Sequence, residues 1–327
     1  MRRWWAAWLA ILDRRESGEP LAIFRIILGF SLIYNLVPAI TSGLVDVLWL
    51  DLHDGGYRAL GDTGSWLVKL AGGPSPELVW SLVVGTLVAA VALLAGVGGR
   101  IGGRLVALVA LQGMFAISMI NSHAKGSYDA LLCNGLWLLV LGDGTATLSL
   151  DAWRREGSLR SSLPVAAWPR YLAITQLCTL YASTGLQKIS AFWTPMGGFT
   201  ALYYILLQPT WHRWQMYWVA WVFPLTQVLT ALTWFWEVFF PLVGLYLYMR
   251  QRTGNGRIRR LLTRWDLRTP YVIFGVSMHL MIFILMEVGP FSLISLAFYP
   301  CLYRPDELRR GWARLLRGVG SFRRSKA

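Results

Sequence analysis

Long apolar segments are the feature that most constrains how this chain folds. A run of about 20 mostly apolar residues is long enough to cross the hydrocarbon core of a bilayer as a helix. Such runs cover residues 21–40, 77–97, 101–120, 129–148, 170–188 and 225–249. The last run, 271–303, is too long for one crossing and contains Gly289-Pro290, which predicts two helices joined by a tight turn. The sequence therefore predicts an all-α polytopic membrane protein with about eight transmembrane helices, and interfacial helices near 200–208 and 216–223.

The composition supports this class and excludes two others. Of the 327 residues, 55% are hydrophobic and only 15% are charged, against about 25% in typical soluble chains. Too few charges remain to cover a water-facing surface, which argues against a pair of soluble domains. The net charge of +14 comes from arginines that lie between apolar runs, so we expect no nucleic-acid partner.

The loop charges predict an orientation. Every second loop is basic, as in cytoplasmic loops of membrane proteins. The basic stretches are residues 2–15, 100–104, 154–160, 250–268 and 304–324. The loop after the first apolar run instead carries Asp46, Asp51, Asp54 and Asp62. This alternation predicts a multi-pass protein of a bacterial inner (plasma) membrane with both termini cytoplasmic.

Three parts are expected along the chain. Residues 1–18 are predicted to be a retained interfacial segment, since the apolar stretch is short and lacks a small-residue cleavage site. Residues 19–303 form the transmembrane domain, and residues 304–327 form a basic tail. The tail and the loop from Arg250 to Arg268 are expected either to be simply solvated or to contact anionic lipid head groups. Cys133, Cys178 and Cys301 fall in apolar runs and are expected to be buried thiols.

Lys188 is the first candidate for a catalytic residue. Burying an ionisable side chain at membrane depth costs free energy, so such a residue usually has a functional role or a structural partner. Lys188 is the last residue of the predicted helix 170–188, where a lysine can simply extend toward the interface. Only 4 of the 31 basic residues are lysines, however, and an arginine cannot give up its proton whereas a lysine in an apolar site can. Lys188 is therefore either a snorkelling cation or a proton-accepting base.

The other candidates each have a structural alternative. His123 lies in a predicted external turn and His279 near the middle of a predicted span, and each is a cavity group or an ordinary satisfied imidazole. Arg25 and Glu237 are cavity groups or a structural pair across helices. No histidine or carboxylate stands at ligand spacing from these residues, so no metal is predicted.

Several short motifs then resemble one family, the HTTM (horizontally transferred transmembrane domain) proteins, which are related to vitamin K-dependent γ-carboxylase. The similarity runs from about residue 19 to 303. In chain order the matching residues are Glu19 to Arg25; Asn121-Ser122-His123 with Tyr128, Leu131-Leu132, Gly142-Asp143 and Leu150-Asp151; Tyr181, Gly185 to Lys188, Trp193 and Gly197; Phe235 to Val238 with Phe240-Pro241; and His279-Leu280 with Phe291-Ser292.

This resemblance implies a reaction and roles. Lys188 would be the base that deprotonates vitamin K hydroquinone or a related menaquinol, with His123 assisting by a hydrogen bond at the same external face. Reaction with oxygen would then yield a base strong enough to deprotonate a glutamate side chain, with carbon dioxide as co-substrate, in a lyase-type carboxylation. Tyr181 and Trp193 would line the same external-facing cavity.

Two departures from the carboxylase widen the functional alternatives. Gln187-Lys188 stands where the carboxylase has two lysines, and the lumenal propeptide-binding domain has no counterpart here. Stand-alone bacterial relatives include proteins that help to mature or export secreted peptides. We therefore carry two hypotheses: a lysine-base enzyme acting on a quinol or a secreted peptide, and a non-enzymatic maturation, export or immunity partner of such a peptide. A transporter is the weaker third, since no inverted repeat is visible.

Overall fold

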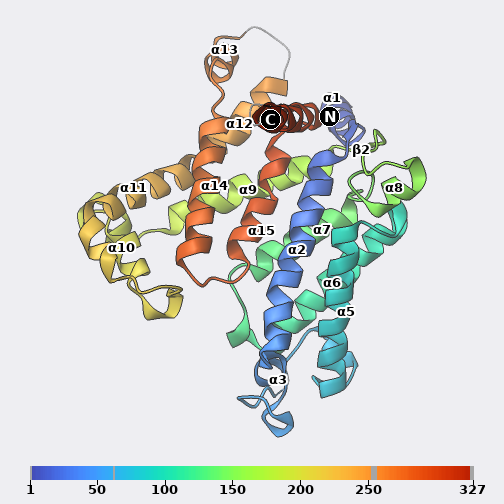
Figure 1. The fold of residues 1–327 in the computed structure, drawn as a ribbon, viewed down its shortest axis with the longest axis vertical. Coiled ribbons are helices and arrows are strands. Elements are labelled where there is room, and N and C mark those ends of the chain that lie inside the picture. The colour runs from blue at the N-terminus through green and yellow to red at the C-terminus, as the bar shows by residue number, and fades with distance from the viewer. Residues whose placement is uncertain (1, 62, 252–255, 325–327) are drawn as a thin grey trace. The chain divides into compact units, whose positions relative to one another are not determined.

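The computed structural model describes residues 2–61, 63–251 and 256–324, and Asp62, residues 252–255 and residues 325–327 lie outside the description. The described chain is helical apart from one short antiparallel strand pair and connecting loops (Figure 1). It divides into two compact units: unit 1 comprises residues 1–172 and 293–327, and unit 2 comprises residues 173–292. The unit boundaries fall inside helices α9, Trp168–Gln187, and α15, Phe291–Ala297.

Unit 1 is built around four helices. They are α2 (Glu19–Thr41), α5 (Pro76–Ala95), α6 (Gly99–Ile120) and α7 (Asp129–Leu141). Each packs on the next and α7 packs back on α2, so the four close into a bundle (Figure 1). A Cβ on Gly29 would lie 2.8 Å from the Leu94 backbone nitrogen, and one on Gly113 would overlap the Thr86 hydroxyl. Glycine at these two positions lets the helix backbones approach closely, as is usual for helices packed in a membrane.

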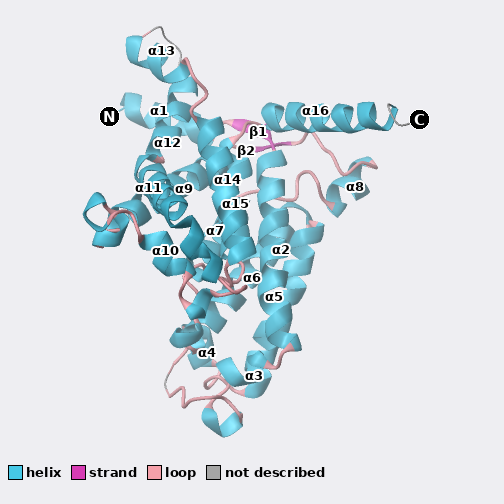
Figure 2. Ribbon diagram, turned by 60° about the vertical axis from the view of Figure 1, so that its left-hand side comes forward, coloured by secondary structure: helices cyan, strands magenta, loops and turns pink. Residues whose placement is uncertain are grey.

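The two ends of unit 1 carry different structures. At one end lie α3 (Leu44–Trp49), α4 (Trp66–Leu70) and the short 3-10 turns Leu52–Asp54 and Ser122–Ala124. At the other lie α1 (Arg2–Leu12), the strands β1 (Arg15–Ser17) and β2 (Pro164–Ala166), α8 (Leu150–Glu156) and α16 (Pro305–Arg324). Figure 2 shows α16 running across the end of α2 rather than continuing along it, and the ion pair Arg309–Glu19, 3.2 Å, joins them. The N-terminal and C-terminal helices therefore share one end of the unit.

The strand pair was not foreseen in the sequence. Glu16 lies opposite Val165 in the antiparallel register, and its carboxylate accepts hydrogen bonds from Arg170 at 2.5 and 2.8 Å. Arg170 also donates to the Cys301 carbonyl, 3.2 Å. The ladder therefore brings a carboxylate to an arginine that is almost fully buried, and this ion pair ties together three separate parts of the chain.

Unit 2 contains most of α9 and five further helices. They are α10 (Ala201–Leu206), α11 (Phe223–Phe239), α12 (Pro241–Gln251), α13 (Arg257–Thr263) and α14 (Arg268–Leu285). Short 3-10 turns cover Ala191–Trp193, Pro195–Gly197, Pro209–Trp211 and Tyr217–Val222, and unit 1 has one more at Tyr299–Leu302. The predicted interfacial helices near 200–208 and 216–223 thus correspond to α10 and to a 3-10 turn.

The predicted spans agree with the structure in part. In the described part of the chain, five helical segments are long and apolar enough to cross a membrane: Glu19–Thr41, Pro76–Ala95, Gly99–Ile120, Tyr217–Phe239 and Arg268–Leu285. The expected break in residues 271–303 is confirmed, because α14 ends at Leu285 and α15 begins at Phe291, with Gly289 in a left-handed conformation at φ +57°.

Two predicted spans are wrong in their extent. The run 225–249 is divided between α11 and α12, since Pro241 has no N–H to donate and its ring obstructs the carbonyl of Glu237. The run 129–148 gives a helix only as far as Leu141. Beyond it, residues 142–149 form an irregular loop whose carbonyls bind a side chain from α2. Among the three free thiols, only Cys301 is fully buried, and Cys133 and Cys178 are half-buried.

Candidate functional site

The side chain that organises unit 1 is Arg25 of α2, which is 1% exposed. Its guanidinium donates to the carbonyls of Leu93 and Leu94, the latter at 3.1 Å, where α5 ends. It also donates to Gly144 at 2.9 Å and to Leu148 at 2.6 Å in the loop after α7. The Leu93 carbonyl also accepts from the Gly96 N–H at 3.1 Å, and the arginine supplies a donor to the buried carbonyls of Leu94, Gly144 and Leu148. Arg25 therefore acts as an internal clamp.

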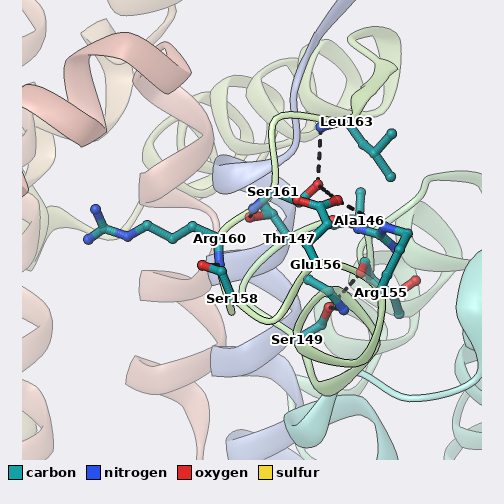
Figure 3. Close-up of polar contacts among 11 residues, drawn as sticks. Ala146, Thr147, Ser149, Arg155, Glu156, Ser158, Arg160, Ser161 and Leu163 are labelled. Atoms are coloured by element: carbon teal, nitrogen blue, oxygen red, sulfur yellow. Dashed lines mark hydrogen bonds and ion pairs between the residues drawn. The ribbon is translucent and has the colours of Figure 1, made fainter.

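The loop that Arg25 binds is held by further polar contacts, drawn in Figure 3. The Ser161 hydroxyl donates to Glu156, 2.6 Å, and the Ser161 N–H donates to the Thr147 hydroxyl, 2.9 Å. Arg155 donates to the Ala146 carbonyl, 2.9 Å. The hydrogen bond from Ser161 and the bond and charge of Arg155 hold the pKa of the Glu156 carboxyl below its ordinary value of 4.5. The loop 142–149 and the basic stretch 154–160 are thus joined by a network of hydrogen bonds.

Unit 2 holds the residue pair most capable of proton chemistry. The Lys188 amine, just beyond the end of α9, donates a hydrogen bond to Oε2 of Glu237 on α11. The two side chains are 19% and 9% exposed, so the pair is largely removed from solvent. The Lys188 Nζ also lies 4.9 Å from the centre of the Trp193 ring, within reach of a cation–π interaction.

A glycine explains why Lys188 and Glu237 meet. A Cβ at Gly185 would lie 2.8 Å from the Val238 nitrogen and 3.0 Å from the Glu237 Cβ, so only a bare backbone allows α9 and α11 to cross this closely. Trp234 adds a hydrogen bond from its indole N–H to the Gly185 carbonyl, 3.1 Å. The crossing leaves Lys188 one turn further along and directly beside Glu237.

A second polar pair lies on the same helix. The Tyr181 hydroxyl and His279 Nε2 of α14 are hydrogen-bonded at 2.7 Å. The Tyr181 ring packs against Trp236 and Phe240 with ring centres 4.5 and 4.6 Å apart. Tyr181 precedes Lys188 by seven residues, which is two helical turns or about 10 Å along the axis. Tyr181 thus lies on α9, and Lys188 directly follows its last residue.

The structure places the remaining predicted residues as follows. His123 lies in unit 1, exposed in the 3-10 turn after α6, and its N–H donates to the Asn121 side chain at 3.1 Å. The hydrogen-bond partner of Lys188 is Glu237, and the assistance of His123 stays a prediction. Arg25 and Glu237, considered as a pair from the sequence, are each bonded within their own unit instead. Among the described residues, no group of three His, Cys, Asp or Glu side chains is arranged to hold a metal ion.

The sequence alone did not decide that Glu237 is the partner of Lys188. Forty-nine positions separate it from Lys188, and no motif spacing reports which two helices cross. A glycine three residues before the lysine was visible in the sequence, and it is the one local signal of close helix packing at this place.

The fold and these sites define a class: an all-α protein whose longest apolar helices meet the requirements for crossing a membrane. Comparison with protein-family models, with curated proteins and with solved structures finds no match to this chain.

Proposed function

We propose that this chain is an integral membrane enzyme, similar to the transmembrane core of vitamin K-dependent γ-carboxylase, with Lys188 as its base. The observation that carries the proposal is the largely buried Lys188–Glu237 pair beside the Trp193 ring. A proton that passes from Nζ to the carboxylate leaves both groups uncharged, and an apolar environment favours uncharged forms over separated charges. Glu237 therefore provides the place to which Lys188 can release its proton.

The residues around the pair suit a planar, lipid-soluble phenol. Trp193 provides a ring face, Phe192 precedes it directly in the chain, and Trp234 lies about one turn of α11 before Glu237. A menaquinol or vitamin K hydroquinone, when bound, would supply the oxidisable ring and the acidic hydroxyl. Lys188, once neutral, would accept the hydroxyl proton, and the surrounding apolar side chains would exclude water from it.

We further propose the eight-span topology with both termini cytoplasmic in a bacterial inner membrane. Within unit 1, the end with α8 and α16 carries arginines of these helices and of β1, whereas α3 at the other end, with the turn that follows it, carries Asp46, Asp51 and Asp54 (Figure 1). This separation is the one that the positive-inside rule describes. Backbone N–H groups of Leu60 and His53 lower the pKa of Asp51, so its carboxylate keeps its charge at that end.

Anionic lipid head groups are proposed as partners of two arginine-rich helices, α16 of unit 1 and α13 of unit 2. Helix α16 carries exposed Arg309, Arg310 and Arg314 beside Trp312, and α13 carries Ile258 and Leu261 among arginines with both side chains about 70% exposed. Such a mixture of exposed apolar and basic residues is typical of helices that lie in the membrane interface.

The test of the enzyme proposal is oxygen uptake by the purified protein in nanodiscs supplied with reduced vitamin K or menaquinol. We expect uptake, and quinone epoxide as a product, from the wild type and from a Lys69→Arg control. Lys188→Arg retains a cation that can bond Glu237 but cannot act as a base, so it should abolish both. Equal uptake by Lys188→Arg and wild type, or none from folded wild type above empty discs, would exclude the lysine-base reaction.

A second function is favoured by one observation: Glu237 already satisfies Lys188, so the pair can be purely structural. The protein would then be a non-enzymatic maturation, export or immunity partner of a secreted peptide. Exposed aromatic side chains at Trp214, Tyr217 and Trp221 in unit 2 offer contact surface for such a peptide. This role predicts that Lys188→Arg still binds and supports a small secreted peptide encoded by a neighbouring gene, with no quinol-dependent oxygen uptake.

A further inference from the structure

A cleft of about 340 Å³ opens on unit 1 between α6 and α7, with Trp66 of α4 at its edge. It lies toward the end that carries α3 and α4, and it shares no residue with the Lys188 site. Its volume falls in the range of small-molecule sites in proteins. The walls are apolar and aromatic, including Phe115 and Trp137, but several polar side chains also face it.

Two of these polar side chains are amides at membrane depth. Gln112 is partly exposed and Asn134 is exposed, and neither side chain has a hydrogen-bond partner among the described residues. Asn134 lies five residues inside α7 and Gln112 eight residues before the end of α6, which is about 8 and 12 Å along each helix. Amides left unsatisfied in hydrocarbon are costly, so this pair calls for an acceptor that enters the cleft.

Two opposite charges stand at the shallow end of the same cleft. Lys125 is exposed in the turn before α7, and Asp129 is the first residue of α7 and is buried. One Asp129 oxygen accepts the Gly126 N–H at 3.0 Å. Within the described ranges the two residues form no ion pair with each other. The cleft therefore presents a separate cation and anion, with neutral donors deeper down.

We propose that this cleft binds one zwitterionic phospholipid of the phosphatidylethanolamine type. The lipid ammonium would pair with Asp129, the phosphate with Lys125, and the ester carbonyls, which lie deeper than the phosphate, would accept from the amides of Gln112 and Asn134. The acyl chains would follow the apolar groove between α6 and α7. This binding site is independent of the proposed enzyme reaction, and it differs from the anionic-lipid surfaces of α16 and α13.

Cys133 lines the cleft and provides a native reporter. The experiment is alkylation of the full-length protein in mild detergent with N-ethylmaleimide, read by peptide mass spectrometry, with Cys178 of unit 2 as internal reference. We expect phosphatidylethanolamine to slow alkylation of Cys133 and leave Cys178 unchanged. Phosphatidylglycerol lacks the cation and phosphatidylcholine cannot donate a hydrogen bond to Asp129, so each should require roughly tenfold more lipid for equal protection.

Variants assign the effect to the named groups. Asp129→Asn keeps an acceptor for the Gly126 N–H but removes the charge, and should lose the preference for phosphatidylethanolamine. Gln112→Leu with Asn134→Leu should weaken protection by all three lipids. Lys69→Gln, which removes a cation at the same end outside the cleft, should behave as wild type. Native mass spectrometry of the co-purified lipid gives a second readout.

Three results would overturn the proposal. The first is that the three lipids protect Cys133 equally. The second is that Asp129→Asn and the double leucine variant leave this protection unchanged while Cys178 reacts normally. The third is that menaquinone or a peptide protects Cys133 whereas no phospholipid does.

Discussion

The Arg25 guanidinium in unit 1 and the Lys188 amine in unit 2 are both cationic groups within apolar helical surroundings, yet their partners differ in kind. Arg25 donates only to backbone carbonyls, which cannot take up its proton. Lys188 donates to a carboxylate, which can. The comparison shows that the hydrogen-bond acceptor decides whether a buried cation only holds the backbone in place or can also exchange a proton.

The backbone around each cation fits this distinction. A Cβ at Gly96 would lie 2.6 Å from the Arg25 guanidinium, and Leu148, which accepts from it, has φ +48°. The chain therefore wraps closely around Arg25. Lys188 instead follows the end of its helix, bonded through its N–H to the Gly185 carbonyl at 3.3 Å, with its side chain still 19% exposed. The Lys188 side chain is therefore enclosed less completely than the Arg25 side chain.

Removing the Arg25 clamp should give the largest effect. Arg25→Met leaves several buried carbonyls without a donor, and we expect the free energy of unfolding to fall by about 3–5 kcal/mol. Arg100→Met removes an exposed arginine from the same end of unit 1 and should cost no more than about 0.5 kcal/mol. Unfolding in detergent micelles followed by circular dichroism measures both. Equal stability of the two variants would show that Arg25 is no clamp.

Breaking the Lys188–Glu237 pair should come second. Lys188→Met or Glu237→Met alone leaves a largely buried charge unpaired and should cost about 3 kcal/mol, whereas the double variant should recover part of the loss. A double-mutant cycle on the same unfolding measurement should therefore give a coupling free energy of about 1–3 kcal/mol. Strict additivity would mean that the two side chains do not interact.

Exchanging the two types of cation sharpens the comparison. Arg25→Lys offers donors at a single point that cannot reach carbonyls on two sides, so we expect a loss of about 2 kcal/mol. Lys188→Arg can still bond one carboxylate and should change stability by less than about 1 kcal/mol. Melting temperatures of both variants test this. A larger loss of stability in Lys188→Arg than in Arg25→Lys would contradict the structural role of Arg25 and the proton-exchange role of Lys188.

The Tyr181–His279 pair should contribute less than either cation. Tyr181→Phe keeps the ring packed against Trp236 and Phe240 but removes one hydrogen bond, so the free energy of unfolding should fall by about 1 kcal/mol. Tyr171→Phe, a matched change on the same helix, provides the comparison. A loss near 3 kcal/mol would indicate that this hydrogen bond also stabilises the packing of neighbouring residues.

The smallest effect concerns pH and residues 158–163, where the Ser161 N–H bonds to Thr147 of the loop that Arg25 holds. Because Ser161 and Arg155 lower the pKa of Glu156 in the folded protein, the unfolded chain binds this proton more readily. The stabilising contribution is therefore complete above pH 4.5 and is lost as the pH falls through the lower folded value. Hydrogen exchange in residues 158–163, corrected for intrinsic rates, should rise over that interval. In Ser161→Ala the rise should begin at higher pH, and identical profiles would refute the linkage.

Helix positions that depend on local sequence were largely predictable. The runs 21–40, 77–97 and 101–120 correspond to α2, α5 and α6 within two residues at each end. Continuous apolar runs of this length favour helix because the backbone bonds to itself within the segment. The break at Gly289-Pro290 was equally local. The resemblance to HTTM proteins and the reaction it implies stay predictions that rest on the residues quoted for them.

Contacts between distant segments were decided by the tertiary structure. The sequence identified Lys188, Glu237 and Arg25 as ionisable residues within apolar segments, but it did not decide which groups they bond to. Glu237 reaches Lys188 because α9 and α11 cross at Gly185, and Arg25 binds two carbonyls of the loop that follows α7. Backbone carbonyls are the same at every position, so no residue pattern marks the ones an arginine will use. Hydrophobic length sets where helices form, whereas the pairing of buried charges depends on which helices pack together.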